Sequence, residues 1–145
     1  MPNTIHHQIL IIGGGSAGIS VAARLRRKGC EDVGLIEPSE KHYYQPLWTL
    51  VGAGLAPAQE TVRSEASVIP KGVAWIKDAA TDIDPAQKTV TTATGTRVSY
   101  DRLVVCPGIQ LDWERIPGTT EALATPYVSL SLIHISEPTR RRGIS

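Results

Sequence analysis

The stretch from Ile9 to Glu37 constrains the fold more than any other part of the sequence. It begins with four consecutive apolar residues, 9–12, which are typical of a strand buried on both faces of a parallel sheet. Three glycines with the spacing G-x-G-x-x-G follow, and residues 19–28 are helical by composition. Gly29 stands where a left-handed residue ends a helix, and residues 33–36 form a second apolar strand. This order predicts an α/β fold with a parallel sheet.

The three glycines have separate physical roles. Gly13 allows a sharp turn off the strand, Gly15 lets the backbone approach a pyrophosphate, and Gly18 lets the helix pack closely on the sheet. The free N–H groups at the helix start hold a diphosphate without a basic side chain. Glu37 follows Gly18 by nineteen residues, where a carboxylate accepts both hydroxyls of an adenosine ribose. A glycine turn that binds nothing is the alternative, but its surroundings favour a dinucleotide site.

Composition limits the function classes. The 145 residues suit one domain, and the formal net charge of +1 becomes −1 without the last sixteen residues, so we expect no nucleic-acid partner. Cys30 and Cys106 are too few for a disulfide framework or a metal site, which predicts a reduced, cytoplasmic protein. Only eight residues precede the first strand, too few for a signal peptide, and His6 and His7 are interpreted as a solvated terminus. No apolar run approaches membrane-spanning length.

The segment after Glu37 is rich in aromatic residues. Residues 38–40 predict a loop, residues 42–48 contain Tyr43, Tyr44 and Trp48, and residues 49–54 could begin a short helix. One interpretation makes this segment a wall of the cofactor site, because such loops cross the carboxyl ends of the strands. The other has its aromatic side chains fill a gap under the sheet. The spacing favours neither.

The second half of the sequence changes character. Residues 73–76 predict a third parallel strand. Short β-type segments at 82–84, 89–92 and 97–100 predict an antiparallel meander. A further buried strand is expected at 102–105, ending in the sequence Cys-Pro-Gly. Glycine directly after a core strand indicates close approach to a second ligand surface.

Longer stretches carry a family resemblance. The glycine fingerprint, residues 36–54 (IEPSEKHYYQPLWTLVGAG), residues 66–77 (ASVIPKGVAWIK) and residues 108–118 (GIQLDWERIPG) resemble sulfide:quinone oxidoreductases, in particular the branch that includes the mitochondrial enzyme. The resemblance covers about residues 8–128. It implies a Rossmann-like FAD-binding three-layer half-domain, with a parallel sheet and an antiparallel meander, and FAD as the cofactor.

The resemblance also implies site residues. The diphosphate would be held by the glycine loop, the ribose by a carboxylate, the adenine by a backbone contact, and the flavin by later segments. In that order the matching positions are Gly13, Gly15, Ser16, Ala17 and Gly18; Glu37; Ala80; and Gln45 and Gly108.

The family oxidises sulfide at a cysteine pair, forms a persulfide and passes electrons through FAD to a quinone. The resemblance therefore implies sulfide and quinone as partners of the parent enzyme, which would lie peripherally on the inner face of a membrane. No catalytic residue is expected in this chain, because the redox cysteines lie beyond it. Cys106 stands where the family usually has alanine, which favours a small packing residue. The alternatives are a type II NADH:quinone dehydrogenase-like flavoenzyme and a non-catalytic nucleotide-binding module.

The end of the sequence differs from the rest. Residues 1–128 are expected to form the N-terminal part of an FAD-binding domain. Residues 129–145 (SLSLIHISEPTRRRGIS) resemble translated sequencing-adapter read-through, which predicts an artefactual or disordered tail; a genuine short basic terminus is the alternative. We expect the chain alone to be inactive and not to hold FAD stably.

Overall fold

The computed structural model describes residues 4–109 and 112–123. The chain divides into two compact units. Unit 1 comprises Met1–His42 and Arg63–Gly108, and unit 2 comprises Tyr43–Val62 and Ile109–Ser145. The sequence-predicted tail at 129–145 lies outside the described residues.

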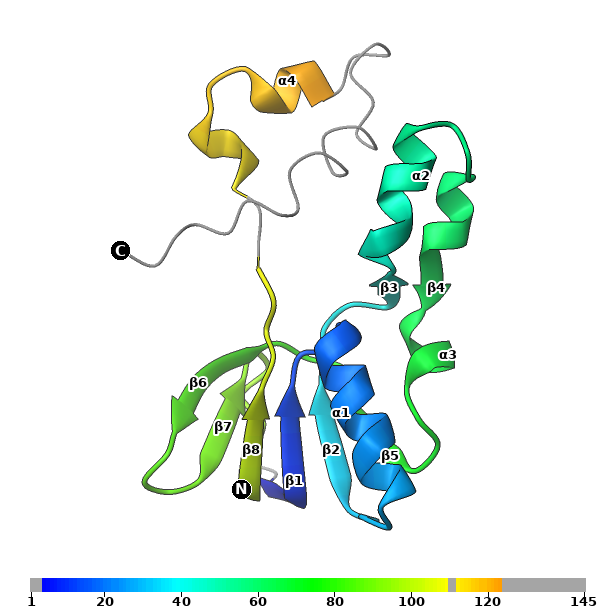
Figure 1. Cartoon of the computed structure of the whole chain (residues 1–145). Helices are drawn as coiled ribbons and strands as arrows, with labels where there is room; N and C mark the ends of the chain where they lie inside the picture. The colour runs from blue at the N-terminus through cyan, green and yellow to red at the C-terminus, as the bar shows by residue number, and fades with distance from the viewer. Residues whose placement is uncertain (1–3, 110–111, 124–145) are drawn as a thin grey trace, which may run out of the picture. The chain divides into compact units, whose positions relative to one another are not determined.

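Unit 1 is built on a six-stranded sheet in the order β5-β2-β1-β8-β7-β6 (Figure 1). The first four strands in that order are parallel, and β8, β7 and β6 form an antiparallel meander. The strands are β1 (Thr4–Ile12), β2 (Val33–Ile36), β5 (Val73–Ile76), β6 (Ala80–Asp84), β7 (Thr89–Thr92) and β8 (Arg97–Val105). The predicted α/β fold, with its parallel sheet and meander, is confirmed.

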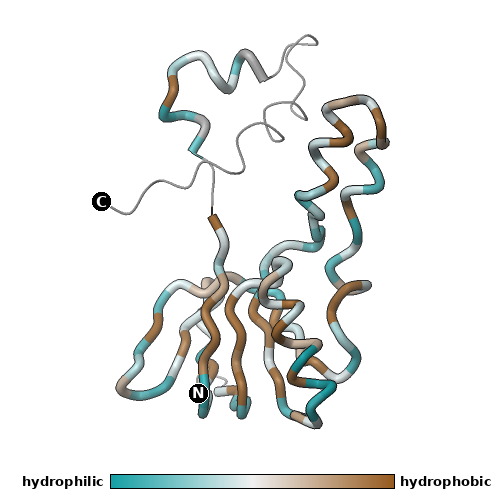
Figure 2. Tube along the Cα trace, in the orientation of Figure 1, coloured by the Kyte–Doolittle hydropathy of each residue, from teal (hydrophilic) through white to brown (hydrophobic). Residues whose placement is uncertain are grey.

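The central strand β1 has an apolar cluster on each face, because neighbouring side chains of a strand point in opposite directions. Leu10 and Ile12 pack with Ile36, Val90 and Val98 on one face. On the other face Ile11 packs with residues of β2 and of helix α1 (Ser16–Arg27). Figure 2 shows the apolar colour concentrated along these strands, with hydrophilic residues at the loops. Each such side chain removed from water contributes about 1.5–3 kcal/mol, so β1 anchors the unit.

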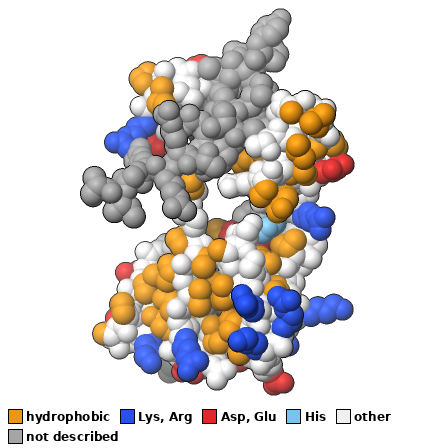
Figure 3. Space-filling model, viewed as in Figure 1, with side chains coloured by type: hydrophobic (Ala, Val, Ile, Leu, Met, Phe, Trp, Pro, Cys, Tyr) orange, Lys and Arg blue, Asp and Glu red, His pale blue; other side chains and the backbone are white. Residues whose placement is uncertain are grey.

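Helix α1 ends as the sequence predicts. Gly29 has a left-handed φ of 85°, two residues after the last helical residue. The last turn carries Arg24, Arg26 and Arg27, whose positive charge suits the helix C-terminus. The Arg26 guanidinium donates to the carbonyl oxygens of Cys30 and Glu31, both at 2.8 Å. Blue side chains gather along this helix on the face shown in Figure 3.

Two predictions about unit 1 are wrong in detail. Residues 97–100 and 102–105 belong to the single strand β8, because β1 pairs with it continuously along both segments. His7 is not part of a solvated terminus: it lies within β1, is 9% exposed, and its Nδ1 lies 2.6 Å from Oδ1 of Asp32. A period-2 strand buries alternate residues, and His7 falls on a buried position.

Short elements complete the described chain. They are β3 (Lys41–Tyr43), η1 (Gln45–Leu47), α2 (Trp48–Gly52), η2 (Ala58–Thr61), β4 (Val62–Ser64), α3 (Glu65–Val68), η3 (Trp113–Arg115) and α4 (Thr119–Leu123). β3 and β4 form a separate two-stranded sheet, and α2 confirms the short helix expected within 49–54. Tyr43 and Tyr44 are about half exposed, which argues against their filling a core. No helix in the described part of the chain is long and apolar enough to cross a membrane.

Candidate nucleotide-binding site

The first glycine of the motif makes the predicted turn. Gly13 has a left-handed φ of 98°, and its N–H donates to the Ile36 carbonyl oxygen at 2.9 Å. A Cβ at Gly13 would overlap the Cys106 carbonyl oxygen. A Cβ at Gly18 would overlap the Gly13 carbonyl oxygen. The geometry at these positions therefore requires glycine, and the predicted close packing of helix α1 on the sheet is confirmed.

The start of α1 is open and has no side-chain cap. Gly15 is the N-cap residue; it makes no side-chain cap hydrogen bond, and the first turn contains no acidic residue. Gly15, Ser16 and Ala17 are exposed, and a Cβ on Gly15 would meet nothing within 4 Å. Unpaired N–H groups at a helix N-terminus, combined with the helix dipole, favour an anion. This end of the helix fits a diphosphate.

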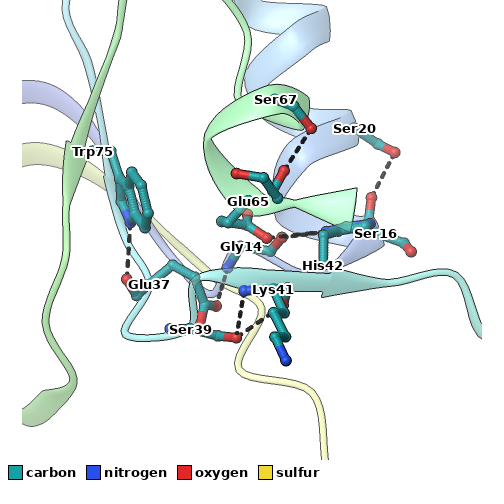
Figure 4. Close-up of polar contacts among 11 residues, drawn as sticks. Gly14, Ser16, Ser20, Glu37, Ser39, Lys41, His42, Glu65, Ser67 and Trp75 are labelled. Carbon is teal, nitrogen blue, oxygen red and sulfur yellow. Dashed lines mark hydrogen bonds and ion pairs between the residues drawn. The ribbon is translucent and has the colours of Figure 1, made fainter. Parts of the chain in front are cut away.

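Glu37 continues from β2 beside the glycine loop (Figure 4). Its Oε2 accepts a hydrogen bond from Gly14 N–H at 2.6 Å, and its Oε1 accepts one from Ser39 N–H at 2.7 Å. Its backbone is also fixed, because Trp75 Nε1 donates to the Glu37 carbonyl oxygen at 2.8 Å. Each carboxylate oxygen has a second lone pair for a hydroxyl group. A fixed, half-buried carboxylate beside the uncapped start of α1 fits the ribose of a dinucleotide.

Gly14 lies between the motif glycines, and sequence reasoning gave it no role. It is buried, and a Cβ there would lie 2.5 Å from Glu65 Oε1 and 2.6 Å from Glu37 Cγ. His42 Nδ1 lies 3.1 Å from the Gly14 carbonyl oxygen. Gly14 is thus enclosed by side chains from β3, from α3 and from the end of β2. In the sequence, the only sign that Gly14 is crowded was that it stands between two other glycines.

Glu65 is the second residue that the sequence did not point to. It begins α3, is 1% exposed, and its Oε2 lies 3.3 Å from His42 Nδ1. Burial raises the pKa of this carboxyl, the His42 charge opposes that shift, and the negative charge of Glu37 adds to it. An acidic residue opening a short helix is usually exposed, so composition alone gave no reason to expect a buried acid here.

The other predicted site residues are less closely grouped. Ala80 opens β6 and packs against the apolar cluster that includes Ile36. Gly108 is exposed with a left-handed φ of 72°, three residues after β8 ends. Gln45 belongs to unit 2, so its contact with a flavin stays a prediction. Cys106 is partly buried, and its N–H donates to the Ile12 carbonyl oxygen at 2.8 Å.

Comparisons with known proteins agree with this arrangement of the Glu37 carboxylate, the turn at Gly13 and the uncapped start of α1. Residues 7–132 match the family described as pyridine nucleotide-disulphide oxidoreductase. The chain belongs to this family. It is 46% identical over 124 residues to the mitochondrial sulfide:quinone oxidoreductase of Mus musculus, covering 85% of this chain. It is also 46% identical over 118 residues to the Dictyostelium discoideum enzyme of the same name, covering 80% of this chain.

Solved structures agree with this assignment. The sulfide:quinone oxidoreductase of Aquifex aeolicus aligns with a TM-score of 0.67 and 29% identity, covering 81% of this chain and 27% of that chain. The resemblance seen in the sequence is confirmed. The chain spans 28% and 26% of the length of the two mitochondrial relatives.

Proposed function

We propose that this chain is the nucleotide-binding segment of an FAD-dependent sulfide:quinone oxidoreductase, the parent enzyme. The family and its sulfide:quinone oxidoreductase members bind FAD. The observation that carries the proposal is the Glu37 carboxylate, hydrogen-bonded to Gly14 N–H beside the uncapped start of α1. A diphosphate and an adenosine ribose need these two features side by side.

Each residue of the segment has a binding role in this proposal. Backbone N–H groups at Gly15, Ser16 and Ala17 hold the diphosphate, and Gly13 and Gly18 give the loop its shape. Glu37 accepts the ribose hydroxyls through lone pairs that Gly14 and Ser39 leave unused. The bound flavin supplies the two-electron redox chemistry.

The remaining predicted contacts are assigned by their place in the sequence. Ala80 is proposed to offer its backbone to the adenine. Gln45 and Gly108 are proposed to border the flavin-bearing half of the cofactor. Their role is to orient the cofactor, because none of the three carries a group suited to the redox step.

The substrates of the parent enzyme are proposed from its relatives' names. These give sulfide as the electron donor and a quinone as the acceptor. The parent is proposed to lie peripherally on the inner face of a membrane. No nucleic-acid partner is proposed.

The test is reduction of a short-chain quinone by the purified parent enzyme, with sulfide and with NADH as alternative donors. Quinone reduction driven by sulfide, in a protein with yellow flavin absorbance, is the expected result. Reduction driven by NADH alone would instead assign the parent to the type II NADH dehydrogenases. A purified parent without flavin absorbance would identify a non-catalytic nucleotide-binding module.

A further inference from the structure

A buried acid lies next to the nucleotide loop without a role in the binding scheme above. Among the residues that the structure describes, Glu65 is one of the few buried polar ones, and its side chain is 2% exposed. Its Oε1 has no hydrogen-bond partner among the residues that the structure describes. A buried polar atom without a partner is costly, commonly more than the net gain from a hydrogen bond. Such a residue calls for an explanation other than stability of the fold.

Glu65 is connected to the loop through one side chain. His42 Nδ1 lies 3.3 Å from Glu65 Oε2 and 3.1 Å from the Gly14 carbonyl oxygen. A carbonyl oxygen only accepts, so Nδ1 must carry a proton to make the Gly14 contact. A carboxyl oxygen that accepts a hydrogen bond beside Nδ1 favours the tautomer with the hydrogen on Nδ1. Glu65 therefore keeps His42 in the state that donates to Gly14.

The Gly14 peptide transmits this contact to Glu37. Its carbonyl oxygen accepts from His42, and its N–H donates to Glu37 Oε2 at 2.6 Å. Figure 4 shows the residues of this path gathered around the loop. Without the contact from His42 to its carbonyl oxygen, Gly14 has more freedom to reorient. Such a movement would turn the Gly14 N–H away from Glu37.

We propose that Glu65 is a positioning residue of the nucleotide site, which acts through His42 and the Gly14 peptide to orient the Glu37 carboxylate toward the ribose. This proposal rests on the proposed function. It assigns Glu65 no contact with the nucleotide, because its side chain is enclosed by protein. Its effect must pass through Glu37, and this makes it separable from a general role in folding.

The test is a double-mutant cycle read by ADP binding to the flavin-free parent enzyme, measured by calorimetry. ADP carries the diphosphate and ribose without the flavin. Loss of one hydrogen-bonded contact corresponds to about a 10-fold change in affinity, so Glu65→Leu should weaken ADP binding roughly 10-fold. Glu65→Gln retains an acceptor for His42 and should stay within a few-fold of the wild type. In a Glu37→Gln background, Glu65→Leu should cause almost no further loss.

The matched control is Asp32→Asn, which alters the histidine–carboxylate pair that His7 of β1 forms with Asp32, far from the loop along β1, and should leave ADP affinity unchanged. If Glu65→Leu fails to fold, His42→Phe replaces it in the cycle, because it removes the same donor from Gly14.

Losses that add fully in the Glu37→Gln background would overturn the positioning role, as would an unchanged ADP affinity in Glu65→Leu. A parent that binds ADP with this coupling but does not oxidise sulfide would overturn only the proposed function. A wild type that does not bind ADP would overturn both.

Discussion

Of the three histidine–carboxylate pairs in the described residues, the two with a largely buried histidine lie at opposite ends of the parallel strands and differ in how well their polar groups are satisfied. His7 and Asp32 form one pair, where Asp32 directly precedes β2. His42 and Glu65 form the other, beside the loop that follows β1. The histidines have similar side-chain exposure, 11% and 12%, but the carboxylates differ: Asp32 is 48% exposed and Glu65 is 2% exposed.

The pair at the amino end is satisfied within the protein. Asp32 Oδ1 lies 2.6 Å from His7 Nδ1, and its Oδ2 accepts from Gln8 N–H at 2.8 Å. The hydrogen bond from His7 lowers the pKa of Asp32. The pair at the carboxyl end has a carboxyl oxygen without a partner in the described residues, a raised pKa and an open helix start nearby. This difference is what we expect if the amino end serves the fold and the carboxyl end binds the proposed nucleotide.

The largest effect is expected from a substitution that blocks the uncapped N-terminus of helix α1. Gly15 has φ −66° and ψ −176°, which a branched residue adopts without strain. Gly15→Val therefore should preserve the fold while placing its side chain in the diphosphate space. The purified parent variant should contain no flavin by absorbance, with an unchanged circular dichroism spectrum. A fully yellow variant would show that the diphosphate lies elsewhere.

The next effect concerns Glu37. A hydrogen bond to a charged group contributes about 1.5–3 kcal/mol, so Glu37→Gln should weaken FAD binding roughly 10- to 150-fold. Flavin retained after dialysis measures this loss. Asp32→Asn is the matched control at the other end of the sheet and should retain its flavin. If both variants retained the same amount of flavin, the proposed functional difference between the two ends of the parallel strands would be contradicted.

The two pairs should also respond oppositely to pH. The raised pKa of Glu65 means that the folded state binds the proton more tightly, so its contribution is full below the ordinary value of 4.5 and is lost as pH rises through the folded pKa. Glu65→Gln should therefore gain stability relative to the wild type above pH 4.5.

The lowered pKa of Asp32 gives the reverse sign. Its contribution is present above the ordinary value of 3.8 and is lost as pH falls through the folded pKa. Asp32→Asn should be less stable than the wild type near neutral pH and equal to it in acid. Urea-unfolding midpoints of the flavin-free protein from acid to neutral pH test both variants. The same sign of pH dependence in both would contradict the comparison.

The smallest effect is expected at Cys106. Its contact with the glycine turn is through the carbonyl oxygen, and its N–H pairs with Ile12, so both contacts survive in Cys106→Ala. Sulfide oxidation by the parent variant should stay within a few-fold of the wild type. Loss of activity with FAD still bound would make Cys106 a catalytic residue.

Local pattern was enough to predict much of the fold. The bounds of β2 and the turn at Gly13 follow from apolar runs and glycine spacing, which act over a few residues. The sequence did not predict that residues 97–105 form one strand, β8, because this depends on pairing with β1, which is far away in the sequence. Strand pairing decides such boundaries only after the chain has folded.

The site divides in the same way. Glu37 follows from its spacing to Gly18, because the βαβ unit fixes that distance. His42 and Glu65 reach Gly14 from 28 and 51 residues away, and neither belongs to the glycine motif or to its spacing rule. Their contact depends on how β3 and α3 return to the loop, which no local pattern records. Burial of Glu65 was therefore visible only in the structure.

The most direct test of the ligand-binding end compares two nucleotides on the flavin-free parent enzyme. In the proposed site Glu37 accepts the ribose hydroxyls, so a phosphate on the 2′ oxygen would bring like charges together. Such a juxtaposition costs several kcal/mol, and 2′-phosphorylated ADP should bind at least about 100-fold more weakly than ADP. Calorimetric titration of the two nucleotides measures this ratio. Equal affinities would contradict the account, because Glu37 could not then lie against the ribose.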